Sequence, residues 1–289
     1  MLSLHTNAAA LSAQNSIGRT QSQLSTSQTR LSTGFRVNSA MDDAAGLQIA
    51  TRLKAQTSGM AMAMRNTQNS ISMLQTAEGS FDEVSTMLIR MKDLATQAAD
   101  ASSTTKDITA LQSEYDALGN ELNNIMKNTT FGGQTLLSGG TIASAMKFQI
   151  GASASEVFNF DMSTNTQNMT TLDTALGLVS ANYATPNTVG NSELSAATVT
   201  TAITNITNAL DEVGAVRSAL GAAANRLDHI YNNLSNVSTN TKAATGRIMD
   251  TDFATESSNM TSSQMLLQAG TAMLKQSNST SSLVMSLLQ

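Results

Sequence analysis

The chain has 289 residues, a formal net charge of −5 at pH 7 and only 13% charged residues. This length is enough for one or two ordinary domains. A nucleic-acid binder or a protein attracted to anionic membranes normally carries a basic patch, and the sequence shows none, so we expect neither kind of partner. The absence of Cys excludes a disulfide framework and thiolate metal sites.

The composition favours long helices. Pro occurs once, Trp is absent, aromatic residues make up 3% of the chain, and there are 17 Met. Aliphatic residues and Met must therefore fill the core. No apolar run approaches the ~18 residues of a membrane span, so we expect no membrane insertion. Residues 1–30 lack the charged and apolar regions of a signal peptide, which predicts a cytosolic protein or one exported without a cleaved signal.

An apolar stripe at helical spacing opens the chain, and the stretch has no acidic residue before Asp42. Residues 34–46 (GFRVNSAMDDAAG) interrupt it, with Ser39 as the predicted N-cap and Asp42 and Asp43 favourably placed at a helix N-terminus. The stripe consists of Leu4, Ala8, Leu11, Ile17, Leu24 and Leu31.

A long helix is predicted from about residue 44 to residue 100. Large apolar residues recur every seven positions from Leu53, but a second series changes register between Ile71 and Ala77. A strict heptad pattern does not do this, so we expect the helix to meet several neighbours rather than one. After a short polar break a second seam runs from Ile108 to Ile125, which predicts an antiparallel helical hairpin.

The pattern changes in the middle of the chain. Alternating apolar residues around a turn predict a β-hairpin at about 145–162, which should lie on the helices because two strands alone are marginal. Residues 163–194, rich in Thr, Asn and Ser, read as an exposed connection with one helical turn near 172–178. From Val199 two adjacent apolar stripes return, which require more than one neighbouring helix. The fold class is therefore mainly α: a long helical hairpin and coiled-coil bundle with one small β-hairpin.

The C-terminal stretch carries another apolar stripe and only two charged residues, Glu256 and Lys275. Such a helix needs a partner, and the N-terminal stripe is the natural candidate. The stripe consists of Phe253, Met260, Leu267, Leu274 and Leu288, with Ser281 at the remaining position.

Few residues suggest site chemistry. His5 and His229 are the only histidines and lie far apart, so no metal site or cofactor is predicted. The sequence shows no H-E-x-x-H, G-x-S-x-G, P-loop or dinucleotide fingerprint, so we expect no enzyme. Arg217 lies in an apolar seam, either paired with an acid or with its charged end extended to solvent; we favour the second.

Four stretches carry long local motifs. They are LSTGFRVNSAMDDAAGLQIATRL (31–53), QTAEGSFDEV with LIRMKDLATQAA (within 71–98), GAVRSALGAAANRLDHIYNNLS (214–235) and DTDFATESS, QAG and SLLQ (within 250–289). These stretches resemble bacterial flagellin, the subunit of the flagellar filament, and occur in the family's order. The resemblance covers about residues 1–150 and 195–289.

The resemblance implies a domain organisation. The terminal helices would pair as the inner-core domain D0, and the long helices with the hairpin would form the outer-tube domain D1. The outer domains D2 and D3 would be absent, since only about 35 residues are available. The boundaries would be 1–43 with 253–289 for D0, 44–162 with 195–246 for D1, 163–194 for the variable connection, and 34–46 and 246–252 for the linkers.

The resemblance also implies function and partners. The chain would be exported unfolded by the flagellar type III apparatus, aided by an export chaperone, and would fold as it polymerises into an extracellular filament with hook-associated and cap proteins at its ends. Low charge on the terminal stripes suits burial in such a core. Arg90, Leu94 and Glu114 match the family's contacts with a host Toll-like receptor. The alternative is a hook–filament junction protein, which shares the terminal helices.

Overall fold

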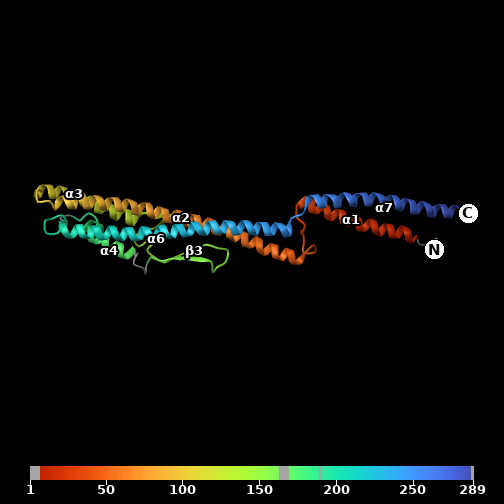
Figure 1. The fold of residues 1–289 in the computed structure, drawn as a ribbon, viewed down its shortest axis with the longest axis horizontal. Coiled ribbons are helices and arrows are strands. Elements are labelled where there is room, and N and C mark those ends of the chain that lie inside the picture. Colours follow the sequence, from red (N-terminus) through yellow and green to blue (C-terminus); the bar gives the residue numbers. More distant parts are fainter. Residues whose placement is uncertain (1–6, 163–168, 189–190, 288–289) are drawn as a thin grey trace. The chain divides into compact units, whose positions relative to one another are not determined.

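The computed structural model describes residues 7–162, 169–188 and 191–287, and it is dominated by helices (Figure 1). Leu4 and Leu288 of the predicted stripes lie outside these residues. The elements are α1 (Ala8–Thr33), α2 (Ala44–Ala98), α3 (Thr105–Asn128), β1 (Thr130–Phe131), β2 (Gln134–Thr135), β3 (Met146–Gln149), β4 (Val157–Phe160), α4 (Met169–Val179), α5 (Ala181–Ala184), α6 (Val199–Met249) and α7 (Phe253–Leu287).

The chain divides into two compact units. The terminal unit comprises residues 1–57 and 239–289, and the central unit comprises residues 58–238. Both boundaries fall inside a long helix, α2 or α6, whereas the family resemblance implied domain boundaries in linkers at 34–46 and 246–252. A helix continues through such a boundary because its backbone hydrogen bonds are local and do not depend on which neighbour its side chains meet.

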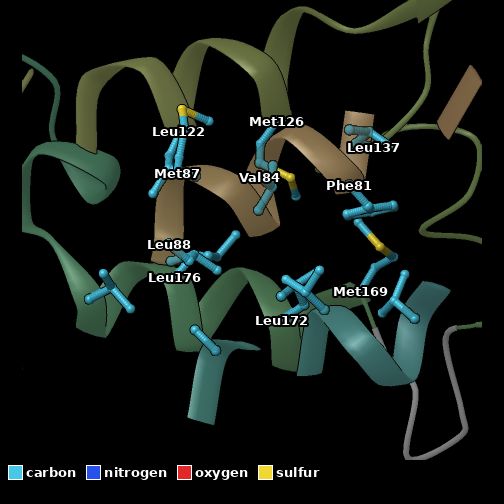
Figure 2. Packing of buried hydrophobic residues seen from close by; sticks show 14 of the residues in the cluster. Phe81, Val84, Met87, Leu88, Leu122, Met126, Leu137, Met169, Leu172 and Leu176 are labelled. Atoms are coloured by element: carbon cyan, nitrogen blue, oxygen red, sulfur yellow. The ribbon is translucent and has the colours of Figure 1, made fainter. Parts of the chain in front are cut away.

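The central unit is built around the buried faces of α2, α3, α4 and α6. Figure 2 shows α2 between α3 and α4, with Phe81, Val84 and Leu88 among its core residues. Leu122 and Met126 reach this core from α3. Several neighbours thus surround one helix, as expected, although the register change from which this was inferred is absent.

The register change predicted within α2 is wrong. The second buried series runs without interruption at intervals of seven residues, because Ala63 and Ser70, rather than Met64 and Ile71, are the buried members. The Ser70 hydroxyl donates to the Asn66 carbonyl oxygen at 2.8 Å, so its burial leaves no donor unpaired. The full series is Ala63, Ser70, Ala77, Val84, Met91 and Ala98.

The predicted hairpin is present as β3 and β4, an antiparallel pair in which Phe148 lies opposite Phe158. Their rings stack with centroids 6.0 Å apart. The Arg226 guanidinium of α6 lies 4.5 Å from the Phe158 ring centroid, which fixes the hairpin on the helices. A second two-stranded sheet, β1 with β2, was not predicted, because two-residue strands carry no alternating pattern.

The helical turn predicted near residues 172–178 is present as part of α4, but the expectation that residues 163–194 are exposed is wrong for one face of this helix. The α4 residues Met169, Leu172, Leu176 and Val179 are all buried, as is Leu194. Every third or fourth residue is apolar, which suits a helix, but the surrounding Thr and Asn concealed this pattern.

Side chains of α3 hold the α5 segment in place. The Tyr115 hydroxyl donates to the Val179 carbonyl oxygen at 2.7 Å, and the Asn123 amide donates to the Tyr183 carbonyl oxygen at 2.6 Å. The Tyr183 hydroxyl donates to Asp173. Burial, followed by the hydrogen bond to Asp173, raises the pKa of Tyr183, so the phenol stays neutral.

Short polar segments set the helix boundaries. Thr104 and Asp107 form a capping box at the start of α3: the hydroxyl accepts from the Asp107 N–H, and the carboxylate accepts from the Thr104 N–H. Ser39 does not cap α2 as predicted. Instead it donates to Asp42, and the Asp43 carboxylate accepts from the Gly46 N–H at 2.8 Å near the first turn of α2. The carboxylate performs this role because α2 begins at Ala44.

Candidate assembly and recognition surfaces

The terminal helices α1 and α7 pack along one seam within the terminal unit (Figure 1). Ile17, Leu24 and Leu31 of α1 are partly buried, as are Met260, Leu267 and Leu274 of α7. Their spacing of seven residues is that of a coiled coil. The positions between them are occupied by small or polar residues, so the seam is narrow. They are Ala13, Thr20 and Ser27 on α1 and Glu256, Ser263, Gly270 and Ser277 on α7.

Three contacts define the antiparallel register of this seam. At one end the Asn7 amide donates to the Ser277 carbonyl oxygen at 3.3 Å. Further along, a Cβ atom on Gly270 would lie 2.9 Å from Ile17 Cγ1, so a larger residue there would push the helices apart. At the other end Arg30 Nη1 lies 3.7 Å from Glu256 Oε2.

Three residues predicted for the seam face away from it. Leu11 is 56% exposed and so is Phe253, and Ala8 is exposed as well. Three further large apolar side chains of α7 are also exposed: Met265, Leu266 and Met273. Leu266 and Met273 lie seven residues apart, so they belong to one stripe outside the seam. Among the described residues, the terminal unit thus buries one apolar face of α7 and leaves a second one uncovered.

The three predicted receptor contacts have different environments in the central unit. Arg90 Nη2 of α2 pairs with Glu114 Oε1 of α3 at 2.7 Å, and both side chains are about half exposed (54% and 46%). Leu94 is only 1% exposed and belongs to the core. The structure therefore places the two charged groups together at the surface and Leu94 beneath it.

Arg217 is paired with acids, contrary to the alternative we favoured. Its guanidinium donates to Glu78 at 2.7 Å and lies 3.0 Å from Asp82. The hydrogen bond to Glu78 raises the pKa of Arg217 above its ordinary value. Glu78 and Asp82 lie one turn apart on α2, and this spacing was the available sequence signal.

The described ranges offer no sign of metal chemistry. They hold no group of three or more His, Cys, Asp or Glu residues placed to bind a metal ion. His229 is exposed on α6. None of the helices in residues 7–162, 169–188 and 191–287 has the length and apolar character that a membrane span requires.

Both terminal regions match family descriptions. Residues 4–141 match the bacterial flagellin N-terminal helical region, and residues 203–288 match the bacterial flagellin C-terminal helical region. The chain belongs to the bacterial flagellin family. It is accordingly a structural subunit of the flagellar filament, a non-enzymatic role, as the sequence motifs predicted.

Individual flagellins align along the whole chain. Flagellin A of Vibrio anguillarum is 33% identical, with 100% of each chain covered, and the flagellin of Halalkalibacterium halodurans is 36% identical over 98% of each chain. Among solved structures, Bacillus cereus flagellin is 28% identical over 63% of this chain and 94% of its own, with a TM-score of 0.48. A putative flagellar hook-associated protein from Vibrio parahaemolyticus is 16% identical, covering 72% of this chain and 100% of its own, with a TM-score of 0.55, and shows a shared fold.

Sequence reasoning found the seam but missed what interrupts it. Glu256 precedes Met260 by four residues and Ser263 by seven, which is the spacing of a seam position. The predicted stripe of α7 does not include it. Its burial follows from the partner helix, which brings Arg30 opposite.

Proposed function

We propose that the chain assembles by coupled folding and polymerisation, with α1 and α7 forming the innermost contacts of the filament. The uncovered apolar stripe on α7 carries this proposal, because Leu266 is 60% and Met273 66% exposed. Burying such side chains favours association by about 1.5–3 kcal/mol each. The seam between α1 and α7 is narrow, so the pair by itself buries too little apolar surface to offset the conformational entropy that is lost when the two helices become ordered.

Truncation tests this proposal. Deleting residues 270–289 removes part of the seam and the end of the stripe but leaves the central unit intact. The shortened chain should remain soluble, keep the thermal transition of the central unit by circular dichroism, and form no filaments from seeds in electron microscopy. Filaments of normal appearance from the truncated chain would contradict the proposal.

A milder variant isolates the stripe itself. Leu266→Ser with Met273→Ser removes the exposed apolar groups without touching the seam, and it should raise the critical concentration for polymerisation at least tenfold. Gln268→Ser on the same helix is the matched control, because Gln268 is exposed and polar. Equal critical concentrations for the two variants would exclude the stripe as a subunit contact.

We further propose that the chain reaches the extracellular filament unfolded, through the flagellar type III export apparatus. The resemblance to the family implies that the export region lies at about Thr26 to Leu47, and this supports the proposal. An export chaperone and the hook-associated and cap proteins are the partners that the family implies. Scrambling residues 26–47 should abolish secretion while the chain still accumulates inside the cell; secretion at the normal level would refute the assignment.

The Arg90–Glu114 pair is our proposed recognition surface for the host Toll-like receptor. Exposure of both side chains and the family match support it, whereas buried Leu94 would act by holding α2 in position. In a cell-based receptor reporter assay, Arg90→Ala monomer should lose at least tenfold in potency, since a charged interface contact is worth about 1.4 kcal/mol or more. Arg65→Ala, an exposed arginine on the same helix, is the control. Equal potency of the two variants would refute the proposal.

A further inference from the structure

The large residues of the α1–α7 seam do not by themselves specify one register. Both helices repeat their large seam residues every seven positions. If α7 slides by seven residues along α1, each large residue still meets one of the same class, except that Ile17 would face Ser263 or Ser277 in place of Gly270. Repeating apolar patterns are known to leave register underdetermined until a polar or charged group breaks the repeat.

One ion pair interrupts this repeat. The described parts of α1 and α7 hold four charged residues, and Arg19 and Lys275 are exposed while Arg30 and Glu256 face each other. Glu256 is 7% exposed, and the Arg30 side chain is 29% exposed. Desolvating a carboxylate is costly unless a cation is near, so Glu256 strongly prefers registers that keep Arg30 opposite it.

Either slip by one heptad separates the pair. In one direction Arg30 would face Ser263, and in the other Glu256 would face Gln23. These residues line the same polar cavity as the ion pair, of about 380 Å³. Ser263 carries no negative charge for Arg30 and Gln23 carries no positive charge for Glu256, so each slipped register leaves an ion without its counter-charge.

The neighbouring linkers hold the same end of the seam. Phe35 and Asp250 form an isolated antiparallel bridge. The Arg36 N–H donates to the Met249 carbonyl oxygen at 2.6 Å, and the Thr251 N–H donates to the Gly34 carbonyl oxygen at 3.0 Å. These bonds use backbone groups and so impose little sequence preference.

We propose that the Arg30–Glu256 pair is a register lock: it selects one alignment of α1 against α7 among heptad-shifted alternatives. The pair acts on specificity more than on stability. Its separation of 3.7 Å is long, and Arg30 Nε is buried without a hydrogen-bond partner among the described residues. Such a pair contributes little net energy in its own register and penalises the others. The inference concerns pairing within one chain and does not rest on the proposed function.

Cysteine crosslinking reads the register directly, because the chain has no native Cys. Ile17→Cys with Gly270→Cys reports the register seen here, since the two positions are in close contact and the atoms that a Cβ at position 270 would meet belong to the Ile17 side chain, which the smaller Cys side chain replaces. Ile17→Cys with Ser263→Cys and Ile17→Cys with Ser277→Cys report the two slipped registers. Each full-length double variant is oxidised in a kosmotropic salt that favours helix pairing, and the intrachain disulfide is quantified by peptide mass spectrometry.

The lock is tested by placing the three reporters in four backgrounds: unchanged, Arg30→Glu, Glu256→Arg, and both together. The unchanged chain should give the 17–270 crosslink almost alone. Either single substitution places like charges together and should lower the ratio of in-register to slipped crosslinks about tenfold. The exchanged pair should restore the original ratio.

The exchanged pair also separates specific pairing from simple loss of structure. If a single substitution abolishes all three crosslinks, recovery of the 17–270 crosslink in the exchanged chain still supports the lock, and failure to recover it overturns the lock. An unchanged 17–270 preference in both single variants would also overturn it, because the backbone bridge would then suffice. Sedimentation of the same samples measures polymerisation separately, so a failed filament does not obscure the register result.

Discussion

Replacing Leu94 with Ala distinguishes a core residue from a surface contact. Leu94 is 1% exposed, so the change removes a fully buried part of the α2 face and leaves a cavity. Buried Leu→Ala substitutions cost about 2–5 kcal/mol. The surrounding core is rich in Met, which can relax partly into the space, so we expect about 3 kcal/mol. For a unit of this size that corresponds to a fall in Tm of about 6–12 °C.

The assay is thermal unfolding of the full-length monomer, followed by circular dichroism at 222 nm. Leu178→Ala is the matched control, because the same side chain on α4 is 63% exposed and should change the free energy of unfolding by less than about 0.5 kcal/mol. Arg90→Ala should likewise leave Tm nearly unchanged, since exposed ion pairs contribute little. If Leu94→Ala and Leu178→Ala shift Tm equally, the burial of Leu94 and our account of its role are wrong.

Three further predictions concern the central unit. Gly119→Ala should destabilise this unit by about 1–3 kcal/mol in urea unfolding, because the new Cβ would lie 2.3 Å from Ser180 Oγ. Gly79→Ala has open space around it and should stabilise the unit by about 0.5–1 kcal/mol. Equal effects of the two substitutions would refute this packing. Hydrogen bonds from Thr104 lower the pKa of Asp107 below its ordinary value of 3.8. The stabilisation by the ionised Asp107 carboxylate is therefore present above pH 3.8 and is lost as the pH falls through the lower pKa of the folded state. Asp107→Asn should flatten the acid limb of the plot of unfolding free energy against pH, and an unchanged limb would contradict the assignment. Arg217→Met should lower the free energy of unfolding by no more than about 1 kcal/mol, because the two carboxylates that pair with Arg217 are substantially exposed. A decrease above about 3 kcal/mol would indicate a buried network instead.

The helices and much of their packing were predictable because burial repeats along a helix at a fixed interval. The stripes of α6 and α7 predicted which residues face a neighbour, as Met260, Leu267 and Leu274 show. The hairpin near Phe158 was an equally local signal, and so is the capping box at Thr104, which was not predicted. Each depends only on residues within a few turns or across one short loop.

Errors arose where small or polar residues occupy seam positions. Ala63 and Ser70 continue the heptad of α2, but neither is large enough to mark it in the sequence. A helical turn was predicted within α4, but its burial was missed because Thr residues lie between its apolar ones. In both cases neighbouring helices determine the burial, and composition does not reveal them.

The sequence alone determined the helical architecture, the family and the pairing of two nearly uncharged termini, because these follow from periodicity and from long local motifs. The tertiary structure decided what each matched residue can do. It placed Arg90 and Glu114 at the surface and Leu94 in the core, although all three belong to the same matched pattern. It also brought Arg30 against Glu256, two residues from opposite ends of the chain whose meeting only the packed helices could define.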